Sequence, residues 1–243
     1  MKKSLILLVA LCALLAGCSN FNWSGTRTVR GSGNVVSETR TVRQFDRVAV
    51  AGSGQLSIVQ DDQESLTIAA DDNLLPLIKS DVAGGLLKIG PDHVNLSPTK
   101  TIRYSLHLKT LKELHLSGSL AAEAQSIKTD HLRIAISGSG RIRVPQLEAG
   151  DIDVQVSGSG DIELAGKVTR QNIQISGSGN YRAGDCDSQD SVIQISGSGD
   201  ATIWARGTLD AQLSGSGTIK YYGSPHSTSH LSGSGSIQSL GNK

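Results

Sequence analysis

Residues 191–200 read SVIQISGSGD, and the four-letter core SGSG returns along the chain from residue 137 to residue 235. A flexible glycine-rich linker would not keep a regular period, but this core does. Copies recur every 18 to 20 residues, which indicates repeats that stack on one another. Their first serines are Ser117, Ser137, Ser157, Ser176, Ser196, Ser214 and Ser232.

Aliphatic and polar residues alternate strictly on both sides of each core. Ile193 and Ile195 precede one copy, and Ala201 and Ile203 follow it. A period of two is typical of β-strands with one buried face. The outward columns favour stacking in register: one reads Gln155, Gln174, Gln194, Gln212, and another reads Arg143, Glu163, Arg182, Thr202, Lys220.

The same alternation, carried through the core, places both glycines on the inner side and both serines on the outer side. A strand that bends around a narrow core has no room for a Cβ, and glycine tolerates the φ values of a bend. A β-bulge at each corner would instead turn the serines inward. The predicted structural corners are Gly138, Gly140, Gly158, Gly160, Gly177, Gly179, Gly197, Gly199, Gly215, Gly217, Gly233 and Gly235.

These patterns predict an all-β fold, a single-stranded parallel β-helix (β-solenoid) with coils of about 18–21 residues. The general chirality of parallel strand connections favours right-handed coiling. The solenoid is expected over residues 35–240, with irregular coils in 35–116 and regular SGSG coils in 117–240, about ten coils in all. A short helical turn is expected in NLLPLIKS (73–80), which contains Pro76.

The N-terminus reads as a bacterial lipoprotein signal over residues 1–17. MKK is followed by an apolar stretch and by LAGC (15–18), where the thiol of Cys18 would accept a diacylglycerol. The apolar run is short for a membrane span, and an ordinary secretory peptide is the alternative. Residues 18–34 are then the lipidated cysteine and a tether, which anchor the protein to a membrane. Ser19 favours the outer membrane, on its periplasmic face or at the cell surface.

Charge and cysteine usage narrow the classes of function. The formal charge is +1, or −1 once Lys2 and Lys3 leave with the signal (1 − 2), so no basic field favours nucleic acid. After removal of the signal and lipidation, Cys186 is the remaining thiol, which excludes an intramolecular disulfide. The acids on either side of Cys186 should raise its pKa and make it a poor nucleophile.

The sequence contains no recognisable catalytic or metal-binding motif. The SGSG cores lack the GK[ST] of a Walker loop and the third glycine of a Rossmann fingerprint. Asp161 and Asp200, with Asn180 between them in one column, are the nearest approach to a calcium site, but Arg141 and uncharged residues complete the column. The six histidines show no metal-ligand spacing. No cofactor, metal or catalytic residue is therefore predicted.

Three stretches carry a resemblance to a known family. QFDRVAVAGSGQLSIVQ (44–60), LTIAADDNLLPLIKSDVAGGLLKIG (66–90) and LKELHLSGS (111–119), followed by SGSG coils, resemble the head GIN domain family of bacterial envelope proteins, also called auto-transporter adhesins. The resemblance covers about residues 40–240. It implies an all-β solenoid in a secreted or lipid-anchored protein, and it brings no catalytic residues.

The resulting hypothesis is a lipid-anchored envelope protein whose solenoid is a non-enzymatic, adhesin-like binding or structural module. Its expected partners are the membrane, through the lipid, and an envelope glycan or protein; the oligomeric state is left open. The alternative is a carbohydrate-active enzyme, a polysaccharide lyase or hydrolase on the same scaffold. Such a site needs two or three acids converging on one face, whereas acids and bases alternate here.

Overall fold

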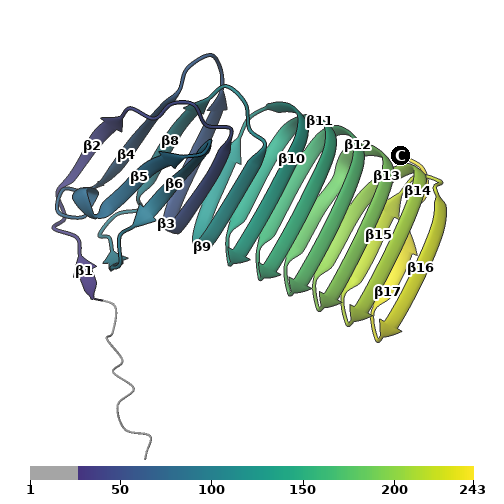
Figure 1. Cartoon of the computed structure of the whole chain (residues 1–243). Helices are drawn as coiled ribbons and strands as arrows, with labels where there is room; N and C mark the ends of the chain where they lie inside the picture. Colours follow the sequence, from purple (N-terminus) through teal and green to yellow (C-terminus); the bar gives the residue numbers. More distant parts are fainter. Residues whose placement is uncertain (1–26) are drawn as a thin grey trace, which may run out of the picture.

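The computed structural model describes residues 27–243, and it consists almost entirely of β-strands. Figure 1 shows an irregular N-terminal region followed by an even stack of coils. The N-terminal elements are β1 (Thr28–Arg30), β2 (Val35–Arg40), β3 (Arg47–Gln60), β4 (Ser65–Asp71), the 3-10 helix η1 (Leu75–Leu77), β5 (Ile78–Ala83), β6 (Leu86–Pro91), β7 (Asn95–Ser97) and β8 (Arg103–Leu108). The predicted helical turn is thus confirmed as η1.

The coil stack confirms the predicted parallel β-solenoid. Each strand pairs in parallel with the coils before and after it, and the serine column stays in register from Ser137 through Ser157, Ser176 and Ser196 to Ser214. Its strands are β9 (Glu113–Ala124), β10 (Ile127–Gly138), β11 (Arg141–Gly158), β12 (Asp161–Gly177), β13 (Asn180–Gly197), β14 (Asp200–Gly215), β15 (Thr218–Tyr222), β16 (His226–Gly233) and β17 (Ser236–Ser239).

The N-terminal region departs from the irregular coils expected for residues 35–116. β2 pairs antiparallel with β4, β4 with β8, and β5 with β6. Gly84 and Gly85, with φ of 56° and 78°, form the two-residue turn between β5 and β6, a loop that favours antiparallel hairpins. β3 continues the stack by pairing in parallel with β9, and β6 and β8 pair in parallel with β3. The solenoid has about six turns, so the larger number of coils expected from the sequence was wrong.

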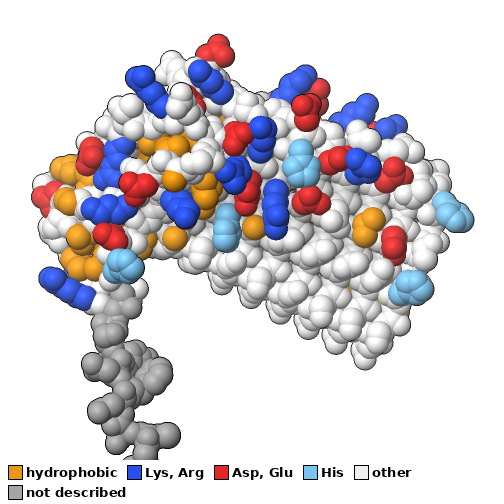
Figure 2. Space-filling view, in the orientation of Figure 1, with side chains coloured by type: hydrophobic (Ala, Val, Ile, Leu, Met, Phe, Trp, Pro, Cys, Tyr) orange, Lys and Arg blue, Asp and Glu red, His pale blue; other side chains and the backbone are white. Residues whose placement is uncertain are grey.

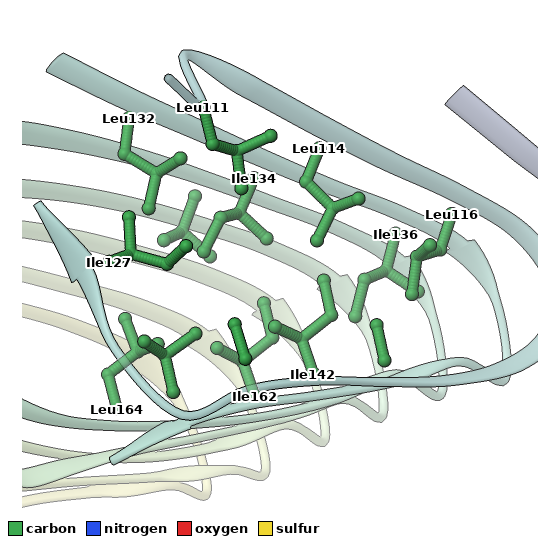
Figure 3. Packing of buried hydrophobic residues seen from close by; sticks show 14 of the residues in the cluster. Leu111, Leu114, Leu116, Ile127, Leu132, Ile134, Ile136, Ile142, Ile162 and Leu164 are labelled. Atoms are coloured by element: carbon green, nitrogen blue, oxygen red, sulfur yellow. The ribbon is translucent and has the colours of Figure 1, made fainter. Parts of the chain in front are cut away.

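The core is one continuous column of aliphatic side chains between the walls of the flattened coils. Figure 3 shows Leu132, Ile134 and Ile136 on one wall facing Ile142 and Ile162 on the other. All five side chains are at most 1% exposed. Burying a side chain of this size contributes about 1.5–3 kcal/mol. The repeated columns thus supply the stability that a single coil lacks.

Neither glycine of a corner leaves room for a Cβ, but the two face different surroundings. The first glycines have φ between 113° and 132°, and at Gly197 an added Cβ would lie 2.3 Å from the carbonyl oxygen of Gly177 in the preceding coil. The second glycines are buried except for Gly235 in the last coil, and at Gly160 a Cβ would lie 2.7 Å from Cγ2 of Ile136. Only the second glycine faces the core. The first lies against the backbone of the neighbouring coil, which differs from the expectation for both.

Candidate functional site

A shallow groove runs across successive coils on the outer face, beside the SGSG corners. Its volume is about 460 Å³, and no Lys, Arg, Asp or Glu of the described chain lines it. In Figure 2 the corner edge of the stack is correspondingly free of charged side chains. We call this hollow of about 460 Å³ the glutamine–serine groove. Its polar lining comprises Gln174, Gln194, Gln212, Ser176, Ser196, Ser214, Ser232 and His230.

Strand register builds this groove. Gln174, Gln194 and Gln212 are Cα partners on consecutive coils, and the serines two residues later are partners in the same way. The aliphatic residue between each glutamine and serine, such as Ile195, is buried. Its burial forces both polar neighbours outward, because successive side chains of a strand alternate between faces. The serines of the corners are exposed, so they form the outer surface rather than an inner hydroxyl ladder.

The polar groups of the groove are available to a ligand. Within residues 27–243, the side-chain amides of Gln174 and Gln194 make no hydrogen bond to another protein group, and neither do the hydroxyls of Ser176 and Ser196. Amides and hydroxyls both donate and accept hydrogen bonds. The groove therefore suits a ligand that carries many neutral donors and acceptors.

Charged side chains lie outside the groove and neutralise one another between coils. Arg143 lies 2.9 Å from Oε1 of Glu123 and 3.2 Å from Oε1 of Glu163. Hydrogen bonds to Glu163 and Glu123 raise the pKa of the Arg143 guanidinium. The predicted alternation of opposite charges is present at these coils. Carboxylates held in such pairs are poorly placed for general acid and base catalysis.

Asp161 and Asp200 each interact with different neighbours, and the thiol of Cys186 is buried. Asp161 lies 3.3 Å from Arg141 and accepts a hydrogen bond of 2.7 Å from Asn180, while Asp200 accepts one of 2.8 Å from the backbone N–H of Thr218. Burial, together with the charge of Asp187, raises the pKa of Cys186 to about 12. No cluster of three potential metal ligands occurs among the described residues.

The sequence identified the glutamine and serine columns but not the groove between them. The hollow depends on how the strand curves into the corner, which the alternation pattern does not encode. The signal that could have indicated it is the lack of charge in both columns from Ser157 to Ser214. Cys18, the predicted lipidation site, lies outside the described residues. In residues 27–243 no helix is long and apolar enough to cross a membrane.

Comparison with known proteins places the chain in a family. The family described as "Putative auto-transporter adhesin, head GIN domain" matches residues 44–225, so the chain belongs to it and the predicted resemblance is confirmed. None of the curated proteins compared with the chain matches it.

Crystal structures of two relatives resemble the fold along most of the chain. A "putative adhesin" from Bacteroides fragilis is 25% identical with a TM-score of 0.82, and the match covers 87% of this chain and 100% of the relative. A "putative lipid binding protein" from Parabacteroides distasonis is 26% identical with a TM-score of 0.76, covering 88% and 100%. The family's adhesin description favours an envelope or surface protein with a binding role.

Proposed function

We propose that this protein is a lipid-anchored envelope protein whose solenoid binds neutral glycans, without catalysis, in the glutamine–serine groove. The observation that carries the proposal is the row of amides and hydroxyls in a groove lined by no charged side chain. Within residues 27–243, the side chains of Gln174, Gln194, Ser176 and Ser196 have no protein partner. Neutral sugars offer many hydroxyl groups and need no counter-charge. A nucleic acid or another polyanion would find no lysine or arginine in the lining.

The repetition of the groove favours a polymer over a single sugar. Each hydrogen bond at a wet surface contributes only about 0.5–1.5 kcal/mol, so one coil alone would bind weakly. Coils about 4.8 Å apart offer the same groups again, and a chain laid along the stack would engage several of them at once. An adhesin that binds a repeating glycan can use such added contacts in place of a deep pocket.

A lipid on Cys18 would anchor the protein to the outer membrane, at its periplasmic face or at the cell surface. Residues 19–26 separate Cys18 from the first described residue and, fully extended, span at most roughly 30 Å. The N-terminal region would then lie close to the bilayer, and the stack would present its groove beyond it. Replacement of Cys18 by alanine should release the protein from the membrane fraction; unchanged fractionation would refute lipid anchoring.

A glycan panel tests the binding role. Immobilised neutral and acidic polysaccharides are exposed to the wild-type protein, to the variant Gln174→Ala/Gln194→Ala/Gln212→Ala, and to the control Gln146→Ala/Gln189→Ala, whose glutamines lie outside the groove. We expect capture by neutral glycans, at least a tenfold loss in the triple variant, and no loss in the control. Equal binding by the triple variant, or a preference for acidic glycans, would refute the site. Release of reducing ends or unsaturated sugars would support the enzyme alternative instead.

A further inference from the structure

Two aromatic rings on neighbouring coils form a second, separate constellation near the C-terminal end of the stack. Trp204 of β14 and Tyr222 of β15 are Cα partners, and both side chains are half-buried. Gly184 of β13 leaves room for the tyrosine ring, because an added Cβ would lie 3.2 Å from Cε2 of Tyr222. The rings thus present a fixed aromatic surface beside the β13 backbone.

The ammonium group of Lys243 occupies this surface. Its Nζ lies 5.5 Å from the centroid of the Trp204 ring and 5.0 Å from that of the Tyr222 ring. It donates a hydrogen bond of 2.6 Å to the carbonyl oxygen of Gly184 and another to Oδ1 of Asp185. Two aromatic faces, a carbonyl and a carboxylate together match what a primary ammonium needs: π faces for the charge and acceptors for its N–H groups.

We propose that Trp204, Tyr222, Asp185 and the Gly184 carbonyl form an ammonium site that binds a lysine side chain of a partner protein, and that Lys243 fills the site when the partner is absent. The cation already there has a lysine stem, which argues for a lysine side chain over a shorter amine. A quaternary ammonium has no N–H for the two acceptors and should bind less well. The ammonium site shares no residue with the glutamine–serine groove and is independent of glycan binding.

The way Lys243 is held allows exchange. Asp185 is 78% exposed even with Lys243 in place, so the site is open to solvent. Residues 240–242 are held by hydrogen bonds of their own, such as Leu240 N–H to the Tyr221 carbonyl at 2.8 Å, and none of these involves the Lys243 side chain. Exposed ion pairs and cation–π contacts are individually weak. A partner lysine can therefore displace Lys243 as a competitor for one site.

Titration of the full chain with Nα-acetyl-lysinamide, followed by NMR at the indole N–H of Trp204, tests this proposal. Lys243→Ala should bind the probe at least fivefold more tightly than the wild type, because the internal competitor is gone. The double variant Lys243→Ala/Asp185→Asn should lose at least tenfold relative to Lys243→Ala. Lys167→Ala, which removes an exposed lysine elsewhere, should behave as the wild type.

Neutral and short probes define the specificity. Nα-acetyl-norleucinamide has the stem without the charge and should not bind; ethanolamine and choline should bind more weakly than the lysine probe. Equal affinity of the wild type and Lys243→Ala, or equal binding of the norleucine probe, would overturn the proposal. If Lys243→Ala loosens the last coil, the single variant Asp185→Asn is used instead. Unchanged affinity of this variant for the lysine probe would overturn the proposed ammonium site.

Discussion

The N-terminal region and the regular coils use glycines of positive φ for different purposes. Gly84, at φ of 56°, has no atom within 4 Å of an added Cβ and serves a hairpin turn. Gly197, at φ of 130°, lies directly against the carbonyl of Gly177 in the coil before. A change in the hairpin is therefore local, whereas a change in a corner separates two coils. The repeat couples every corner to its neighbours.

Substitution of each of these two glycines by alanine should give the largest difference in the free energy of unfolding. Gly197→Ala combines an unfavourable φ with a backbone clash and should lower the free energy of unfolding by about 4 kcal/mol. Gly84→Ala carries only the cost of the left-handed conformation, about 1 kcal/mol. Urea unfolding of both variants measures the difference, and equal losses would show that coil contact does not constrain the corners.

Core positions should show a similar contrast between the middle and the end of the stack. Ile195 is 2% exposed, whereas Leu231, in the same column of the last full coil, is 51% exposed. Ile195→Ala should cost about 3 kcal/mol because it leaves a cavity. Leu231→Ala should cost less than about 1 kcal/mol, since little apolar area is lost. Comparable losses in thermal or urea unfolding would indicate that the last coil is covered in solution.

The N-terminal region should be more sensitive to acid than the coils. Asp71 is fully buried and accepts hydrogen bonds from the N–H groups of Gly33 and Thr99 at 2.8 and 3.0 Å and from the Thr99 hydroxyl. The Thr99 hydroxyl contributes most to lowering the pKa of Asp71. A lowered pKa means that the stabilisation is complete above the ordinary aspartate value of about 3.9 and is lost as the pH falls below it.

Hydrogen exchange, expressed as protection factors, measures this sensitivity. Between pH 6 and pH 3, protection should fall more in β2 and β4 than in β12 and β13. Asp71→Asn should remove most of that difference, because the amide does not titrate. An equal loss of protection in the two regions of the wild type would contradict the role of Asp71.

The smallest effect should come from the outward serines. Ser196→Ala removes an exposed hydroxyl that makes no hydrogen bond within the described chain, so the free energy of unfolding should change by no more than about 0.5 kcal/mol. A loss above about 2 kcal/mol in urea unfolding would mean that the serines have buried partners. The neighbouring Gly197 and Ser196 thus provide a matched pair within one corner.

The regular coils were predictable because every coil repeats the same burial. The alternation around Ile193 and Ile195 gave the strand phase, and the period of the serines gave the stacking. The first glycine of each corner was misplaced, because strict alternation cannot show a residue of positive φ packed along the stack. The antiparallel hairpin at Gly84 and Gly85 was missed although a two-glycine turn is its usual signal.

The sites were harder to predict than the fold. The ammonium site around Trp204 was not predicted, because Lys243, which lies over the Trp204 ring, also contacts Asp185, a residue 58 positions earlier in the chain. That proximity depends on where the chain runs after the last regular coil, and no repeat encodes it. The glutamine–serine groove, by contrast, follows from columns visible in the sequence once the corner geometry is known.

NMR titration of the glutamine side-chain amides tests the proposed role of the repeat most directly. The neutral oligosaccharide that binds best in the glycan panel is added to isotope-labelled protein. Binding in the groove predicts shifts of the NH₂ signals of Gln174, Gln194 and Gln212, with Gln146 unchanged and the sugar intact. Shifts confined to other residues, or cleavage of the oligosaccharide, would contradict a non-catalytic glycan-binding groove along the coils.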